Sequence, residues 1–337
     1  MTLKFAIAGA GYIANVHAQA IRAQKTAELV AVAGKFSPKA AAFSKKFGLK
    51  RHYETVEDML KDGDVDALVI GTPNFLHAPQ AIAALNAGLH VMVEKPMAMN
   101  AREAAKMLET SQKSGARLMV AHCWRFDKDV LWLKSQVGKL GKIIRTKGCG
   151  VHVNWGPAGW FTQKTLAGGG ALADVGIHAL DTARFLLGDP QPVSVYARIG
   201  TYYQDFDVDD TGVVIVNWDN GAVSYIESGW WQPHADGPEA ATQLYGTKGF
   251  GQLFPTFIKD EGGRLALSEV EGMKDAGLPF PRKEHCPQSM YDDQMAYFVK
   301  CIETGQTPVP GGEEGLVNMK IVDAAYRSAL SGKVEKI

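Results

Sequence analysis

Over the first 122 residues, short apolar segments alternate with stretches in which apolar residues recur every three or four positions. Segments of the first kind predict buried strands, and those of the second kind predict amphipathic helices. Their regular alternation is typical of a parallel sheet covered by helices on both faces. We predict six strands, at KFAIAG, LVAVAG, RHYET, DALVIG, HVMVE and RLMVAH. The intervening helices are predicted over residues 13–22, 38–47, 78–87 and 101–114, with a short one at VEDML.

After residue 122 the pattern changes to longer strand-like segments, beginning at KIIRTKGCGVHVNW. Asn220–Gly221 separates two of them, and this dipeptide is a strong signal for a two-residue hairpin. Helices are predicted over residues 171–187 and in two segments near the end of the chain. We therefore predict an α/β protein with two domains. Residues 1–122 form a doubly wound parallel sheet, and residues 123–337 form a mostly antiparallel sheet, with last helices that can pack back on the first domain.

The composition is typical of a globular protein: 46% of the 337 residues are hydrophobic, 21% are charged, and the formal net charge is zero. This balance argues against nucleic acid or a membrane surface as a partner. No apolar run approaches the ~20 residues needed to cross a bilayer, and a signal peptide is not expected. The four cysteines are far apart in the sequence, which suits reduced thiols and a cytoplasmic location; we predict no metal site.

The first strand is followed by a turn with the pattern G-x-G-x-x-A, formed by Gly9, Gly11 and Ala14. In such a turn the first glycine allows the tight bend, the second lets a pyrophosphate approach the backbone, and the small third residue lets helix and strand pack closely. The following helix offers free backbone amides to the phosphates. Because the motif lies between a strand and a helix, as it should, we predict contacts with a dinucleotide at Gly9, Gly11, Tyr12 and Ile13.

The end of the second strand bears on which dinucleotide binds. An NAD site usually has Asp or Glu there to bind the ribose 2′-hydroxyl. Here Gly34 takes the place of the acid and leaves room for a 2′-phosphate, Lys35 can neutralise it, and Ser37 can donate a hydrogen bond. We predict NADP(H) as the favoured cofactor, with contacts at these three residues. The alternative is that Lys35 is a solvated surface charge and NAD(H) binds without the acid.

Ligands of open α/β sheets bind beyond the carboxyl ends of the strands. One strand ends in Thr72, Pro73 and Asn74, with His77 at the start of the next helix. We predict cofactor contacts at these four residues. His77 has a second interpretation, as a cap of that helix.

The apolar strand HVMVE ends at Glu94 and Lys95, which are followed by Pro96. A proline disfavours the α conformation of the preceding residue, so Lys95 is held extended at the edge of the sheet. We predict a functional role for Lys95 at the cofactor, with an ordinary surface lysine as the alternative. Glu94 either holds Lys95 in place or contacts the cofactor.

A second group of ionisable residues follows the glycines at 168–170. Asp174, His178 and Asp181 are spaced i, i+4 and i+7, which places them on one face of a helix. One interpretation is a histidine paired with two aspartates on a solvated face. The other is a histidine that titrates near neutral pH and is oriented by a carboxylate, as acid–base catalysis requires.

Three segments together resemble the glucose–fructose oxidoreductase, inositol dehydrogenase and MocA (Gfo/Idh/MocA) family: GAGYIANVHAQAI, VIGTPNFLHAPQAIAALNAGLHVMVEKPMA and GGGALADVGIHALD. The resemblance implies an N-terminal Rossmann domain, a C-terminal domain with an open, mostly antiparallel sheet, and NAD(P)-dependent chemistry at hydroxyl or carbonyl groups of sugars, inositols and related polyols. The family's catalytic lysine, aspartate and histidine match Lys95, Asp174 and His178, which would also contact the substrate. Asp181 matches as a structural or orienting residue.

The resemblance extends to an aromatic and basic segment at the start of the second domain, which Trp124 and Arg125 match. Trp155 and Trp160 add flat aromatic faces of the kind that suit a carbohydrate ring. We predict substrate contacts at these four residues; the alternative for each aromatic residue is a place in the core. Many relatives have Trp-Arg before the glycine run, and Phe161 replaces that arginine here.

Two other functions are compatible with the sequence. Some relatives keep the nicotinamide bound and cleave glycosides through transient oxidation. A non-catalytic NAD(P)- and sugar-binding regulator is the second, and the joint presence of Lys95 and His178 argues against it. The expected partner is a small sugar or polyol, and the resemblance implies a homodimer or homotetramer formed through the C-terminal sheet.

Overall fold

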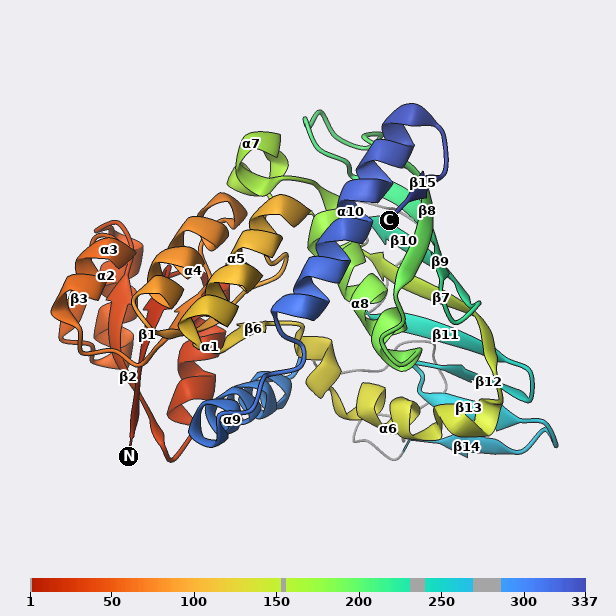
Figure 1. The fold of residues 1–337 in the computed structure, drawn as a ribbon, viewed down its shortest axis with the longest axis horizontal. Coiled ribbons are helices and arrows are strands. Elements are labelled where there is room, and N and C mark those ends of the chain that lie inside the picture. Colours follow the sequence, from red (N-terminus) through yellow and green to blue (C-terminus); the bar gives the residue numbers. More distant parts are fainter. Residues whose placement is uncertain (1, 153–155, 231–239, 269–285) are drawn as a thin grey trace. The chain divides into compact units, whose positions relative to one another are not determined.

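The computed structural model describes residues 2–152, 156–230, 240–268 and 286–337 (Figure 1). The chain forms two compact units. Unit 1 consists of residues 1–123 and 287–316, and unit 2 consists of residues 124–286 and 317–337. The boundary predicted after residue 122 lies next to the end of the first segment of unit 1, and a later segment adds a C-terminal helix to that unit.

Unit 1 contains a parallel sheet with the strand order β3-β2-β1-β4-β5-β6. The strands are β1 Leu3–Ala8, β2 Ala27–Ala33, β3 Arg51–Tyr53, β4 Ala67–Ile70, β5 His90–Val93 and β6 Leu118–Val120. The helices are α1 Tyr12–Arg22, α2 Pro38–Phe47, α3 Val56–Asp62, α4 His77–Asn86, α5 Ala101–Ser114 and α9 Gln288–Thr304. This is the Rossmann order. All six strands predicted from the sequence are confirmed.

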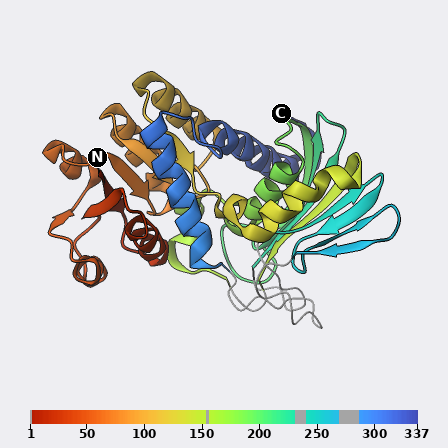
Figure 2. The same cartoon turned by 90° about the horizontal axis from the view of Figure 1, so that it is seen from below.

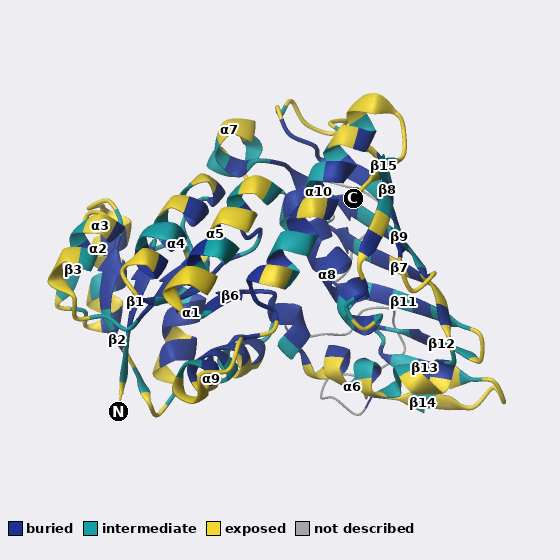
Figure 3. Cartoon of the chain, viewed as in Figure 1, coloured by how far each residue is buried: buried dark blue, intermediate teal, exposed yellow. Residues whose placement is uncertain are grey.

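The strands of unit 1 are apolar because helices cover the sheet (Figure 3). In β4, for example, all four residues have no exposed surface. Three helices begin at residues whose side chains accept a hydrogen bond from a backbone amide: Ser37, Thr55 and Asn100. The strand order reverses between β1 and β4, and the carboxyl ends of strands at such a point form the ligand-binding edge of the sheet.

Unit 2 contains a sheet with the strand order β14-β13-β12-β11-β7-β10-β9-β8-β15. Between the described strands, the β7–β10 pair is parallel and the other pairs are antiparallel. The strands are β7 Ile143–Val151, β8 Pro192–Gly200, β9 Thr211–Trp218, β10 Val223–Gly229, β11 Ala241–Gly246, β12 Gly249–Gln252, β13 Phe257–Asp260, β14 Leu265–Leu267 and β15 Glu335–Lys336. The helices are α6 Lys128–Gln136, α7 Lys164–Ala167, α8 Ile177–Leu186 and the greater part of α10 Gly312–Ser331. Helix α8 packs on β7, β10 and β11 (Figure 2).

The predicted hairpin is confirmed, since the turn at Asn220–Gly221 joins the antiparallel strands β9 and β10. Its loop has three residues, 219–221, and not two, because the Trp218 amide donates to the carbonyl oxygen of Ala222. The prediction of a single helix over residues 171–187 is wrong in one respect. The region consists of a π-helical segment, Leu172–Gly176, followed by α8. The strands β11–β14 were not predicted, because they are short and two of them contain glycines, which weaken the strand pattern. None of the described helices combines the length and the apolar character needed to cross a membrane.

Candidate functional site

The glycine-rich turn joins β1 to α1 at the carboxyl edge of the unit 1 sheet. Gly9 has a φ angle of +97°, and a Cβ atom there would lie 2.7 Å from the carbonyl oxygen of Gly71. Backbone conformation and close packing therefore both require glycine at this position. At Gly11 a Cβ atom would meet no other atom within 4 Å, so the space beside the backbone is open.

Helix α1 begins at Gly11 without a side-chain cap and without an acidic residue in its first turn. Its free amides can therefore receive an anion, and together with the open space they fit the pyrophosphate of a dinucleotide. Ala14 is fully buried, so the helix packs closely on the sheet. Ile13 lies beside Gly71, where an added Cβ would be 3.0 Å from its Cγ2, whereas Tyr12 is 80% exposed.

The residues predicted to select the cofactor form an exposed loop after β2. The amide of Gly34 donates to the carbonyl oxygen of Tyr53 at 2.9 Å, and its own carbonyl oxygen lies 3.0 Å from His52 Nε2. Lys35 and Ser37 are exposed. The Oγ of Ser37 accepts a hydrogen bond as the cap of α2, so its hydroxyl proton can still be donated to a ligand.

His77 joins the loops that follow β4 and β5. Its Nδ1 lies 2.9 Å from the carbonyl oxygen of Pro96, and its Nε2 lies 2.9 Å from that of Thr72. Burial lowers the pKa of His77, against the effect of these two hydrogen bonds, and a neutral imidazole can donate to only one of the two oxygens. The His77 ring thus lies between the loops after β4 and β5 at the edge of the sheet where the cofactor is predicted to bind. Neither interpretation made from the sequence included this role. Pro73 and Asn74 follow Thr72, and Asn74 is buried.

Glu94 and Lys95 follow β5 directly. Glu94 is buried, and its Oε1 lies 2.7 Å from Nε2 of His17 in α1. Its Oε2 accepts a hydrogen bond from the Lys95 amide at 3.1 Å. Glu94 thereby ties the backbone of Lys95 to α1, and Lys95 itself is half-buried. Of the two roles predicted for Glu94, this geometry favours holding Lys95 in place.

His17 was not among the residues predicted from the sequence. It is 1% exposed, and the ring of Tyr291 in α9 lies edge-on to it at 6.0 Å. A polar residue on the apolar face of a helix needs a partner, because burying it unpaired is costly. The position of His17 on the apolar face of its helix was therefore a signal in the sequence. It did not identify the partner, Glu94, which is 77 positions away.

In unit 2, Asp174 lies in the π-helical segment and His178 in the first turn of α8. Such segments occur frequently at functional sites. The Oδ2 of Asp174 accepts a hydrogen bond from Trp230 Nε1 at 3.1 Å, and His178 is 4% exposed. Asp181 bonds instead to Arg125. The two aspartates therefore have different partners, although their spacing suggested one polar stripe.

Arg125 and Trp124 lie in the interior of unit 2. Arg125 is 4% exposed; it donates to Asp181 at 2.8 and 2.9 Å and to Asp189 at 2.7 and 3.1 Å. Trp124 is 1% exposed and packs against Phe254 with ring centroids 5.5 Å apart. Because the guanidinium and the indole are enclosed by these partners, the geometry favours structural roles over the predicted substrate contacts.

The other predicted substrate contacts lie in the segment between β7 and the glycine run. Trp160 is partly exposed and stacks on Phe161, with ring centroids 3.8 Å apart. Trp155 lies outside the described residues. Within the part of the chain that the structure describes, no group of three or more His, Cys, Asp or Glu side chains is arranged to hold a metal ion.

Two family models match successive parts of the chain. Residues 3–122 match the model described as "Oxidoreductase family, NAD-binding Rossmann fold", and residues 135–250 match the one described as "GFO/IDH/MocA C-terminal domain". The chain belongs to the Gfo/Idh/MocA family. It is an NAD(P)-dependent oxidoreductase, and the family resemblance found in the sequence is confirmed.

Several relatives of this Gfo/Idh/MocA oxidoreductase are similar to it over nearly their whole length. The D-glucoside 3-dehydrogenase of Escherichia coli (strain K12) is 31% identical over 98% of this chain and 96% of that protein. The D-xylose 1-dehydrogenase (NADP(+)) 2 of Haloferax volcanii is 30% identical over 90% of each. Among solved structures, the aldose-aldose oxidoreductase from Caulobacter crescentus complexed with glycerol has a TM-score of 0.84 at 28% identity, with 100% of both chains covered.

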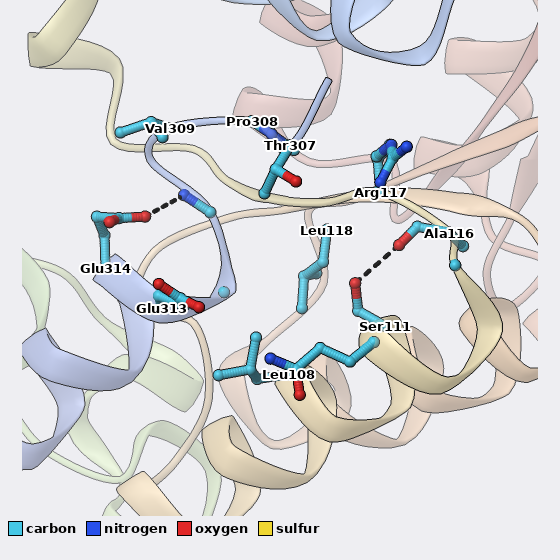
Figure 4. Close-up of a pocket in the computed structure, with 14 residues that line it drawn as sticks. Leu108, Ser111, Ala116, Arg117, Leu118, Thr307, Pro308, Val309, Glu313 and Glu314 are labelled. Carbon is cyan, nitrogen blue, oxygen red and sulfur yellow. Dashed lines mark hydrogen bonds between the residues drawn. The ribbon is translucent and has the colours of Figure 1, made fainter. Parts of the chain in front are cut away.

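A separate cavity of about 240 Å³ lies in the Rossmann domain of this Gfo/Idh/MocA protein (Figure 4). It is lined by the end of α5, by Arg117 and Leu118 at the start of β6, and by residues 307–314, with Glu313 and Glu314 on one side. The cavity is at the amino end of β6, whereas the glycine turn and Lys95 are at carboxyl ends of strands. It is therefore not part of the candidate cofactor site.

Proposed function

We propose that the protein transfers a hydride between NADP(H), in preference to NAD(H), and a hydroxyl or carbonyl carbon of a sugar or related polyol. The observation that carries the proposal is the position of Lys95 directly after β5, on the edge that holds the glycine turn, with its backbone bonded to Glu94. The names of the relatives support a sugar substrate, because they specify a D-glucoside and D-xylose.

In the proposed reaction, His178 removes the proton of the substrate hydroxyl during oxidation and returns it during reduction. The Lys95 ammonium stabilises the negative charge that develops on the hydroxyl oxygen. Asp174 orients the site and balances its charge. When bound, the nicotinamide accepts or supplies the hydride. The half-buried position of Lys95 supports its role, because a charge acts more strongly where water is partly excluded.

A panel of sugars, glycosides and polyols with NADP⁺ or NAD⁺ tests the proposed activity. We expect net formation of free reduced cofactor, followed by absorbance, with at least one member of the panel. Glycoside cleavage without net reduced cofactor would replace the proposal by transient oxidation on a retained nicotinamide. Tight sugar binding without turnover would instead indicate a non-catalytic NAD(P)- and sugar-binding regulator.

The preference for NADP(H) is proposed from the loop after β2. Gly34 occupies the position where NAD sites usually have an acidic residue, so no carboxylate there repels a 2′-phosphate. The exposed Lys35 supplies a positive charge next to it. The Ser37 hydroxyl adds a donor at the start of α2. The name of the Haloferax volcanii relative specifies NADP(+), whereas that of a Bacillus subtilis relative specifies NAD(+), so the proposal rests on the loop.

We expect NADPH to bind more tightly than NADH, and Lys35→Ala to raise the Kd for NADPH about tenfold, since a hydrogen bond to a charged group is worth roughly 1.5–3 kcal/mol. The Kd for NADH should change little. Lys45→Ala is the matched control, because it removes the same charge from an exposed position at the other end of α2. Fluorescence titration of both cofactors measures these constants, and tighter binding of NADH by the unaltered protein would contradict the preference.

We also propose that a second copy of the chain covers the outer face of the unit 2 sheet. Buried and half-buried residues alternate along β9 and β10. The buried set faces α8, as the proximity of Ile226 and Ala179 to Gly148 indicates. The half-buried set includes Val213, Ile215, Val223 and Tyr225. The same set contains Asn217 and Glu227, and Lys147 of β7 lies over the Tyr225 ring, so the face is a mixture of apolar and polar side chains. A mixed face of this kind suits the self-complementary interface of a homodimer, or of a homotetramer built from such dimers.

A further inference from the structure

Two consecutive aspartates, Asp209 and Asp210, lie immediately before β9, and both are buried. Their oxygens accept hydrogen bonds from the backbone of three separate segments: residues 170–172, residues 202–204 and Trp230. Residues 170–172 directly precede the segment that carries Asp174, and Trp230 donates a hydrogen bond to Asp174. The two aspartates therefore contact the neighbours of a candidate site residue, although they are not predicted site residues themselves.

Asp209 holds the start of the helical segment that carries Asp174. Its carboxylate accepts from the amides of Gly170 and Leu172, each at 2.8 Å, and its carbonyl oxygen accepts from the amide of Ala171, also at 2.8 Å. The Tyr326 hydroxyl donates to the same carboxylate at 2.7 Å. Three amides at the beginning of a helix are thus satisfied by one residue from a distant part of the sequence. Burial raises the pKa of Asp209, against these hydrogen bonds.

The glycine run is explained by this contact. A Cβ atom at Gly170 would lie 1.8 Å from the carbonyl oxygen of Asp209, and one at Gly169 would lie 2.1 Å from the Tyr326 hydroxyl. Only glycine therefore lets the chain approach Asp209 closely enough for its amides to bond. The π-helical segment is fixed in the same way at its other end, because a Cβ at Gly176 would lie 2.7 Å from that of Ser228 in β10.

Asp210 holds the backbone of Trp230. Its carbonyl oxygen accepts from the Trp230 amide at 2.7 Å, and its carboxylate accepts from the amides of Tyr202, Tyr203 and Gln204. The Trp230 side chain has no exposed surface and packs with Ala171, Val175 and Val208. Because the backbone and the ring of Trp230 are both held in place, its indole N–H has a fixed orientation. The N–H donates a hydrogen bond to Asp174 at 3.1 Å.

We infer that Trp230 is a positioning residue for Asp174, and that Asp209 and Asp210 fix the two partners of this hydrogen bond; the inference rests on the proposed role of Asp174 in the reaction. Asp209 sets the start of the segment that carries the carboxylate. Asp210 sets the residue that donates to it. The indole N–H then favours the orientation of the Asp174 carboxylate in which Oδ2 accepts its hydrogen bond.

Trp230→Phe tests the inference, because phenylalanine keeps an aromatic ring in the pocket and removes the N–H. Trp218→Phe is the matched control: Trp218 is also buried in unit 2, and its indole donates to Ser224 at 2.7 Å. Both variants should lose comparable thermal stability. We expect Trp230→Phe to lower kcat about tenfold without changing the Kd for NADPH, and Trp218→Phe to leave kcat near its original value. Equal effects of the two variants on kcat would overturn the inference.

A double-mutant cycle with Asp174→Asn separates this inference from the proposed function. If Trp230 acts through Asp174, Trp230→Phe should have little further effect on kcat/KM once Asp174 is replaced. Equal losses in both backgrounds would overturn the positioning role. If Asp174→Asn alone leaves turnover unchanged, the proposed role of Asp174 fails and the inference fails with it. If Asp174→Asn is damaging and Trp230→Phe is not, the inference alone is wrong.

Discussion

Replacing His178 with asparagine should lower kcat by roughly 10²–10⁴-fold, the range for the loss of a positioned acid–base group. Asparagine keeps a polar side chain at this buried position but cannot accept and release a proton near neutral pH. The Kd for NADPH should remain the same, because the predicted cofactor contacts are residues of unit 1. Steady-state kinetics with the best substrate of the panel and fluorescence titration of the cofactor measure the two quantities.

His90→Asn is the matched control for this prediction. His90 is half-buried at the first residue of β5, at the opposite end of the strand from Lys95, so the same chemical change should leave kcat nearly unaltered. Near-normal turnover of the His178 variant would exclude His178 as the acid–base group. Lys95→Met should reduce kcat at least as much as the His178 change, because it removes the cation proposed to stabilise the developing negative charge.

The Rossmann half of the fold could be predicted because local pattern and tertiary structure agree there. Each strand of a covered parallel sheet is a short apolar run, and each helix has an apolar face, so both periods can be recognised in the sequence. In unit 2 the pattern was less informative. The paired strands β9 and β10 were predicted from alternation and the Asn220–Gly221 turn, but strands such as Gly249–Gln252 have too few apolar residues to be recognised.

The candidate site shows what residue type alone cannot establish. Gly9, Gly11 and Lys95 could be proposed from the sequence because a glycine motif after a strand and a proline after a lysine are local signals. The tie between His17 and Glu94 and the bond between Trp230 and Asp174 join positions 77 and 56 residues apart, and no local pattern specifies such pairs. The π-helical segment was not predicted for a similar reason: its apolar spacing resembles that of an α-helix, and its contacts with Asp209 and β10 join positions far apart in the sequence.

Replacing Arg125 with methionine should lower the free energy of unfolding by about 3–5 kcal/mol, the cost of leaving a buried ion pair without one partner. Its two carboxylate partners are fixed at 2.7–3.1 Å, and Asp181 is almost fully enclosed, with a side-chain exposure of 2%. Burial alone would lower the pKa of Arg125, but Asp181 and Asp189 outweigh it and raise the pKa. Methionine fills much of the space and leaves the buried Asp181 carboxylate without its guanidinium partner. Urea denaturation measures the loss.

The companion variants separate charge from packing. Arg125→Met with Asp181→Asn should recover part of the lost stability, because the buried negative charge is removed together with its cationic partner. Arg264→Met should have little effect, since its ion pair with Asp260 lies on a side chain that is 89% exposed. The same variants distinguish a structural role of Arg125 from the substrate contact predicted from the sequence. A substrate contact would raise the KM for the sugar and leave the unfolding free energy nearly unchanged. The enclosed geometry predicts the reverse: a large loss of stability and, at temperatures where the variant is folded, an unchanged KM.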